Sequence, residues 1–278
     1  MNIFLSLGVA GRAYRSILPL MLRPAHWLPF LVLAAVQYVA LGILVAFHQP
    51  VVAPIGVPLI RLAGGDKAMH YPMLFLYLPS MYSRIMLVVA VLFASVVVAV
   101  ATLRFARTLG FAPAGRAPTS IRRHLPTLIL VSVPPTLAIL ALSWLAGQVP
   151  TDLILNNPKV RWGVRGGVLL AVVLVQSFVS YATAWVVLQG HSVVAALRDS
   201  CRVTARTFLP TFLVIAIPVV ALYPISYVMQ RVDLFVGKLR PETIAGLLAL
   251  RIAAELLFGF LIVGAVTRLF LWRTESAR

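Results

Sequence analysis

The stretch LPTLILVSVP, from Leu125 to Pro134, returns 84 positions later as LPTFLVIAIP, from Leu209 to Pro218. Both copies are apolar, and each has one proline at its second position and one at its last. Proline is tolerated in the first turn of a helix, where its missing N–H would have no partner anyway. We therefore interpret each LP pair as the place where the chain enters a long apolar helix.

The second proline of each stretch, Pro134 or Pro218, lies eight residues deeper. A proline at such a depth removes a backbone hydrogen bond and frees the carbonyl of the residue four positions earlier. We expect both prolines to kink their helices, as packing features or as gating hinges. We also expect a neighbouring helix, a serine or water to satisfy the freed carbonyl.

The composition of the chain indicates lipid rather than water as its main solvent. Of its 278 residues, 61% are hydrophobic and only 11% are charged, whereas a soluble domain has about 25% charged residues. Its apolar runs have the length that a helix needs to cross about 30 Å of hydrocarbon, and helices satisfy their own backbone groups there. The sequence predicts an all-α polytopic protein, a single integral membrane domain over residues 1–278. The predicted spans cover about residues 26–47, 85–105, 125–146, 166–188, 209–229 and 244–271.

The repeat extends beyond the proline stretches. At the same offset of 84, Arg122 matches Arg206 and Thr183 matches Thr267. The first pair of spans also begins similarly, because its first span opens with HWLPFLVLAA and has Pro29 in the corresponding place. We predict three pseudo-repeated helical hairpins, each preceded by a basic, partly amphipathic stretch, and related by an axis along the membrane normal. The repeat units cover about residues 1–107, 108–190 and 191–278.

The net charge of +17 comes from basic residues in the connections between apolar runs. This distribution fits anionic lipid headgroups, and no nucleic-acid partner is expected. The N-terminal segment, the second and fourth connections and the C-terminus carry fourteen Lys and Arg residues, against nine in the other connections. By the positive-inside rule both termini are expected in the cytoplasm, and the arginine-rich, Ala- and Val-rich composition favours a bacterial inner membrane. The expected contacts with anionic lipid on that side are Arg12, Arg15, Arg122, Arg123, Arg198, Arg202 and Arg206.

Glu255 is the only acidic residue well inside a predicted span, and Arg251 lies four positions earlier on the same helical face. Charged groups at this depth are rare, and they are usually paired or functional. The two residues are either a structural ion pair or part of a polar cavity that carries a proton or holds an anionic headgroup. Gln37 and Gln176 are expected to face the bundle interior. Together these four residues form the hypothesised substrate or proton site.

No motif for catalysis or for a cofactor stands out. The five histidines fall at span ends or in connections, Cys201 is the only cysteine, and no HExxH, GxSxG or P-loop pattern is present. We therefore expect a non-enzymatic protein with no cofactor and no metal.

The fourth connection, HSVVAALRDSCRVTARTFLPTF, repeats arginine every four residues at Arg198, Arg202 and Arg206. This pattern predicts a basic interfacial helix that leads into a span. Here the chain resembles the six-helix membrane domain attached to some glycerophosphodiester phosphodiesterases and to related bacterial inner-membrane proteins, in which a segment like AALRDSCRVTARTF precedes a span. Their soluble catalytic domain has no counterpart in this sequence, so the resemblance implies no catalytic residue.

Two functions remain open at this stage. The first is a protein that handles or transports a lipid-like or small amphipathic substrate. The second is an accessory or scaffolding subunit, with a membrane-protein partner or a second copy of itself. A pocket of several hundred Å³ beside Glu255 would favour the first. The aromatic stretch from Met69 to Arg84 is expected to lie at the outer membrane interface or to cap a cavity as a lid.

Overall fold

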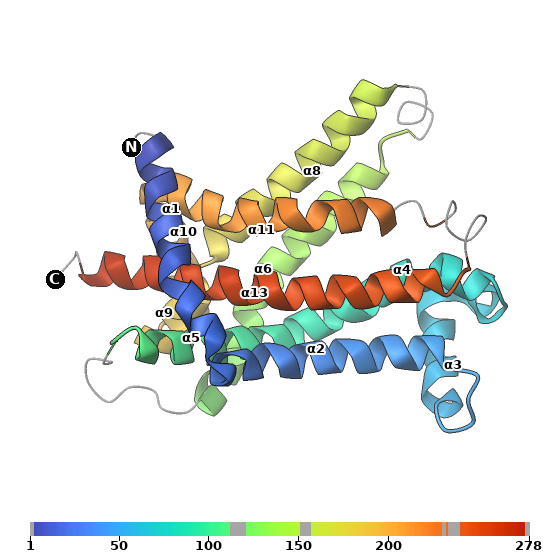
Figure 1. Cartoon of the computed structure of the whole chain (residues 1–278). Coiled ribbons are helices and arrows are strands. Elements are labelled where there is room, and N and C mark those ends of the chain that lie inside the picture. The colour runs from blue at the N-terminus through green and yellow to red at the C-terminus, as the bar shows by residue number, and fades with distance from the viewer. Residues whose placement is uncertain (1–2, 112–120, 151–156, 230–231, 233–239, 276–278) are drawn as a thin grey trace. The chain divides into compact units, whose positions relative to one another are not determined.

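The computed structural model describes residues 3–111, 121–150, 157–229, 232 and 240–275 (Figure 1). All regular elements in these ranges are helices, and no strand occurs among them. The predicted all-α class is therefore confirmed.

Within the residues that the structure describes, six helical stretches are long and apolar enough to cross a membrane, so the chain is a multi-pass membrane protein by the length and composition of its helices. Each matches a predicted span. The second begins at Met73 instead of Ile85 and contains a π-helical turn, while the fourth is interrupted after Val179. The helices are α2 (Pro24–Val45), α4 (Met73–Val89) with the π-helical turn η3 (Ala90–Ala94) and α5 (Ser95–Thr108), α6 (Ile121–Gly147), α8 (Pro158–Val179) with α9 (Ala182–Gln189), α11 (Phe208–Met229) and α13 (Thr243–Glu275).

Shorter helices lie between and before these stretches. Two of the three predicted amphipathic stretches are helical, as α1 (Ile3–Ile17) and α10 (Val193–Arg206), while most of the third, residues 112–120, lies outside the described residues. A helix that the sequence did not predict, α3 (Ala53–Gly64), lies in the connection between the first two spans. The described residues also include two 3₁₀ helices, η1 (Leu18–Leu22) and η2 (Asp66–Met69).

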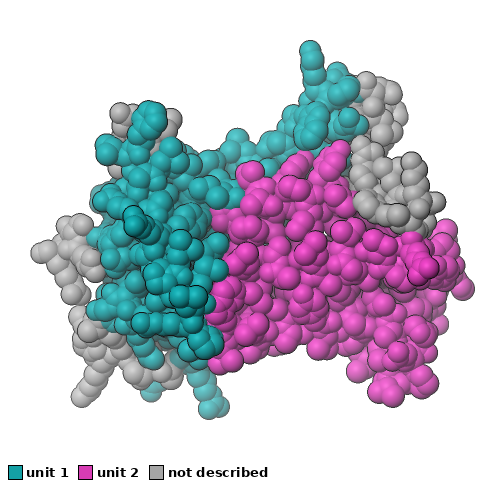
Figure 2. All heavy atoms as spheres, viewed as in Figure 1, with its two compact units in different colours: residues 1–26, 95–217, 261–278 teal, residues 27–94, 218–260 magenta. Residues whose placement is uncertain are grey.

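The chain divides into two compact units, coloured separately in Figure 2. Unit 1 comprises residues 1–26, 95–217 and 261–278, and unit 2 comprises residues 27–94 and 218–260. The unit boundaries fall inside long helices, so α2, α11 and α13 each contribute residues to both units. They do not coincide with the predicted repeat boundaries near residues 107 and 190, and the three-hairpin repeat stays a prediction.

Unit 1 has a core rich in small side chains, which let helices approach closely. Gly264 of α13 is one such contact, because a Cβ added there would lie 2.7 Å from a methyl group of Ile17 in α1. The buried small residues of this core are Ala10, Ala13, Ala99, Ala106, Ala182, Ala184, Ala196 and Ala265.

Unit 2 contains the aromatic stretch from Met69 to Arg84. Most of this stretch is the first part of α4, which packs one face into the unit 2 core, whereas Tyr71, Met73, Leu76 and Tyr77 are exposed. Its position at the outer membrane interface or as a lid stays a prediction. The side chain of Arg84 caps α3, since its Nη1 donates to the carbonyl of Ala63 at 2.5 Å. The buried residues are Leu74, Phe75, Leu78, Met81 and Tyr82.

Hydroxyl groups of α10 hydrogen-bond the backbone groups at the interruption between α8 and α9 in unit 1. Ser200 Oγ donates to the carbonyl of Phe178 at 2.7 Å and accepts from the amide of Tyr181 at 3.2 Å. Thr204 Oγ1 donates to the carbonyl of Ser177 at 2.9 Å. Ser200 and Thr204 are fully buried, so backbone groups left open by the break find partners inside the protein.

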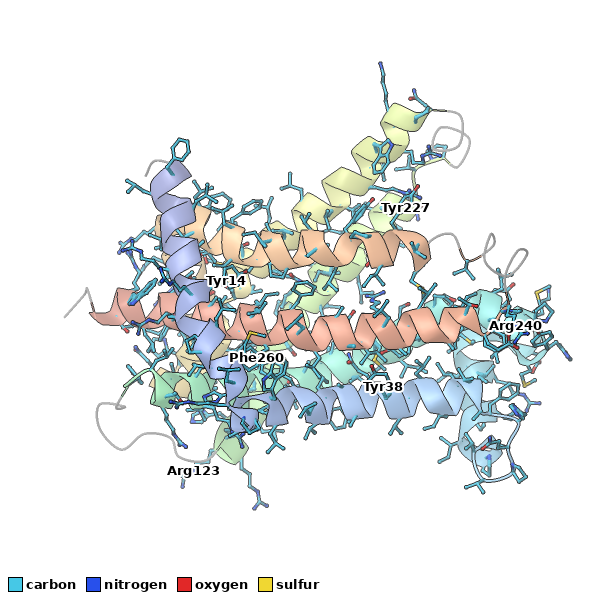
Figure 3. The ribbon with its side chains drawn as sticks, in the orientation of Figure 1. Tyr14, Tyr38, Arg123, Tyr227, Arg240 and Phe260 are labelled. Atoms are coloured by element: carbon cyan, nitrogen blue, oxygen red, sulfur yellow. The ribbon has the colours of Figure 1, made fainter. Side chains whose placement is uncertain are left out.

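The expected fate of a proline-freed carbonyl is observed at Pro218. Because Pro218 has no N–H, the carbonyl of Val214 loses its helical donor. Tyr14 of α1 donates its hydroxyl to this carbonyl at 2.5 Å (Figure 3). Burial raises the pKa of Tyr14 above its ordinary value, so the hydroxyl stays protonated and remains a donor.

At the first LP entry, a carbonyl freed by a proline also accepts a hydrogen bond from a side chain of another helix. Pro29 lies in α2, and the carbonyl four positions earlier belongs to Ala25. Arg104 of α5 donates to that carbonyl through its guanidinium group. Both α6 and α11 continue as helices through Pro134 and Pro218.

The bond from Tyr14 gives a testable prediction for stability. We expect Tyr14→Phe to lower the free energy of unfolding by about 1–2 kcal/mol, because the carbonyl of Val214 is left without a donor. In a Pro218→Ala background the effect should largely vanish, since alanine restores the helical N–H. Thermal unfolding in mild detergent measures both.

A matched control is Tyr38→Phe. Tyr38 Oη donates to the carbonyl of Ala249 at 2.8 Å, at a point in α13 where no proline removes the helical donor (Figure 3). This variant should change stability by less than about 0.5 kcal/mol. Equal losses for the two tyrosines would contradict the role assigned to Pro218.

Candidate anionic-ligand site

One face of α10 carries the charges of the candidate site. Asp199, Arg202, Val203 and Arg206 are spaced by three or four residues, which places them on the same side of the helix. An adjacent side of α10 packs against α6, α8 and α9 through small buried residues. These buried residues are Ala196, Ser200 and Thr204.

The C-terminal part of α13 supplies the second wall, again with residues three or four apart. Phe270, Arg273 and Thr274 face the same pocket as the charged face of α10. Trp185 of α9 completes it and meets Phe270 edge to face, with ring centroids 5.1 Å apart. We call this space, about 480 Å³ in volume and lined within unit 1 by these residues and the charged face of α10, the arginine pocket.

The arginine pocket contains three guanidinium groups and one carboxylate. The carboxylate of Asp199 is mostly buried and is shared among neighbours: it lies 3.3 Å from Nδ1 of His191, 3.6 Å from Nε of Arg198 and 3.9 Å from Nη1 of Arg202. Arg206 and Arg273 form no ion pair with any residue that the structure describes. Among the side chains that the structure describes, the pocket lining therefore carries more positive than negative charge.

Local structure explains why arginine suits two of these positions. Arg206 and Arg273 lie in the last turns of α10 and α13. A cation there interacts favourably with the carbonyl end of the helix dipole. This interaction stabilises each helix end, and it leaves the guanidinium hydrogen-bond donors available to a ligand.

Aromatic contacts fix the positions of the aromatic residues that line the pocket. The indole of Trp185 stacks on the imidazole of His191, with ring centroids 4.7 Å apart and planes inclined by 21°. Phe270 lies 6.3 Å from Tyr181 between ring centroids. Tyr181 is buried, and its hydroxyl hydrogen-bonds Thr211 Oγ1 at 2.6 Å. The pocket lining thus combines charged residues with aromatic residues that are fixed by packing.

The structure brings together only some of the arginines expected at an anionic surface. Arg202 and Arg206 line the arginine pocket, while Arg198 is exposed on the same helix outside it. The other four lie elsewhere in the described chain: Arg12 and Arg15 are exposed on α1, and Arg122 and Arg123 lie in the first turn of α6 (Figure 3).

The hypothesised site around Glu255 is arranged differently. Arg251 Nε donates to Glu255 Oε1 at 2.7 Å, so the predicted pair is present, and each side chain is about one third exposed, at 37% and 32%. Neither residue lines the arginine pocket. Gln37 is half-buried in unit 2 with the pair, whereas Gln176 is half-buried in unit 1. A joint role for the four residues therefore stays a prediction.

Six lining residues were missed by sequence reasoning: Trp185, Asp199, Val203, Phe270, Arg273 and Thr274. Asp199 carried a signal, because it shares a helical face with Arg202 and Arg206. Arg273 was counted only as a C-terminal positive charge. Its approach to α10 is a tertiary contact that no local pattern encodes.

The described residues contain no group of three or more His, Cys, Asp or Glu side chains that could hold a metal ion. Comparison of the chain with protein-family models, with curated proteins and with solved structures gives no match. The function must therefore be argued from the arginine pocket itself.

Proposed function

We propose that this multi-pass membrane protein binds and handles an anionic, lipid-like substrate in the arginine pocket. The observation that carries the proposal is the composition of the pocket lining, which combines three arginines with three apolar residues, Trp185, Val203 and Phe270. Guanidinium groups recognise phosphate through paired hydrogen bonds, and basic pockets between membrane helices bind anionic headgroups. The apolar residues of the lining then suit the glycerol and the first carbons of an acyl chain.

The location supports a lipid rather than a soluble anion. α10 leads directly into the span helix α11, and Arg273 lies at the end of the span helix α13, where a headgroup would lie at the membrane surface. By the positive-inside rule we expect this surface to face the cytoplasm, and the proposed membrane is a bacterial inner membrane. Transport or transfer of the bound lipid, without chemical conversion, is the activity we propose, in keeping with the resemblance to phosphodiesterase-linked membrane domains.

Two arginines on one helix provide the test. Arg206 lines the arginine pocket and Arg198 does not, although both are exposed on α10. Losing one charge-assisted hydrogen bond weakens binding by about tenfold. Native mass spectrometry with added phosphatidylglycerol should show that loss for Arg206→Gln and less than about a twofold change for Arg198→Gln. Equal effects of the two variants, in protein with unchanged thermal unfolding, would refute a specific pocket.

A second candidate function is that of an accessory or scaffolding subunit. The observation that favours it is the sparse packing of α6 and α8 in unit 1: Trp144 and Trp162, near their outer ends, are 64% and 54% exposed. A membrane-protein partner or a second copy of the chain would cover this surface, and so would lipid. A stoichiometric protein that co-purifies in mild detergent, while Arg206→Gln has no effect on lipid binding, would favour this function over the first.

A further inference from the structure

We infer that the ligand of the arginine pocket carries a phosphomonoester, as in phosphatidate, rather than the phosphodiester of common anionic phospholipids. This inference deepens the proposed function and rests on it. The inference follows from the charge balance of the pocket, from the number of its hydrogen-bond donors and from its apolar lining residues.

The charge balance points to a dianion. Arg202, Arg206 and Arg273 contribute three positive charges to the lining, and Asp199 contributes one negative charge. Asp199 is also engaged by His191 and Arg198, which lie outside the lining, so it offsets no more than one of the three. At least two positive charges remain. A phosphomonoester carries about −1.5 to −2 at neutral pH, whereas a phosphodiester carries only −1.

The number of donors agrees with this choice. A phosphomonoester presents three terminal oxygens that accept strong hydrogen bonds, and a diester presents only two. Each guanidinium group offers a planar pair of N–H donors suited to phosphate oxygens. The three lining arginines can therefore each engage one terminal oxygen of a monoester. A diester would leave one of them without a charged acceptor.

The apolar residues of the lining identify the source of the phosphate. A site for free phosphate requires donors all around the anion, but three of the lining residues, Trp185, Val203 and Phe270, are apolar. An ester carbon and the beginning of an acyl chain fit against those side chains. The geometry thus points to a phosphomonoester on a lipid, in preference to inorganic phosphate or a small water-soluble ester.

The experiment compares ligands on the full-length protein at pH 8, where the monoester is a dianion. Native mass spectrometry should show phosphatidate binding about tenfold more tightly than phosphatidylglycerol with the same acyl chains. Glycerol phosphate and inorganic phosphate at millimolar concentration should not displace it. Arg273→Gln should bring the ratio of the two lipid affinities close to one, and Arg198→Gln should leave it near tenfold, with thermal unfolding as the folding control.

Each other outcome overturns a defined part of the account. Equal affinities for the two lipids would overturn the monoester inference while leaving lipid binding intact. Displacement of phosphatidate by glycerol phosphate would overturn the lipid source. Binding of neither lipid would overturn the inference together with the proposed function.

Discussion

Replacing Ser200 by alanine is expected to lower the free energy of unfolding by about 2–5 kcal/mol. The loss is large because one hydroxyl satisfies two buried backbone groups, the carbonyl of Phe178 and the amide of Tyr181. Alanine leaves both without a partner at the break between α8 and α9. Trp185, which lines the arginine pocket, lies in α9 directly after this break, so we expect weaker lipid binding to accompany the loss of stability.

The control for this prediction is Ser143→Ala. Ser143 Oγ donates to the carbonyl of Ile139 at 2.9 Å, within an uninterrupted part of α6 and at an exposed position. That carbonyl keeps its helical donor, so the change in stability should stay within about 0.5 kcal/mol. Denaturant titration in mild detergent measures both variants. A Ser200→Ala protein as stable as Ser143→Ala would show that α10 does not support the break.

The second large effect concerns Glu255. Replacing it with leucine leaves Arg251 as an unpaired cation inside a span helix, and such a charge costs about 2.5–3.5 kcal/mol on insertion scales. We expect a loss of that size in Glu255→Leu. The double variant Arg251→Leu/Glu255→Leu should recover most of it, because it removes both charges.

Exchanging the two residues separates pairing from a functional role. Arg251→Glu/Glu255→Arg keeps the i, i+4 pair in reverse order, so its thermal unfolding should resemble that of the unchanged protein. Lipid binding should also persist, since neither residue lines the arginine pocket. Loss of lipid binding in this stable variant would move the substrate site from the arginine pocket to the pair.

The spans were predictable because hydrocarbon thickness imposes a length and a polarity on every crossing helix. The ion pair of Arg251 and Glu255 was predictable for a similar reason, since both its spacing and its cost in lipid are local properties. The start of α4 at Met73 was not predictable from local properties. Its tyrosines, methionines and Pro79 resemble an interfacial segment, and only packing in the unit 2 core makes them a continuous helix.

Only part of the candidate site was predictable from the sequence. Helical periodicity placed Arg202 and Arg206 on one face of α10, but the pocket needs Trp185 and Arg273, which come from other helices. In the same way, a proline predicts that a carbonyl is freed and does not predict its donor. The donor at Pro218 is Tyr14, 200 residues away from Val214 along the chain.

Labelling of the single natural cysteine tests the central claim most directly. Cys201 is exposed on α10, the helix that carries the arginine pocket. In intact bacterial cells a membrane-impermeant maleimide should not label it, whereas in inverted membrane vesicles it should. Lys67→Cys in a Cys201→Ser background, in the first connection between spans, should show the reverse. Labelling of Cys201 from outside intact cells, or of both positions from one side, would contradict a multi-pass protein that offers its arginine pocket to cytoplasmic anionic lipid.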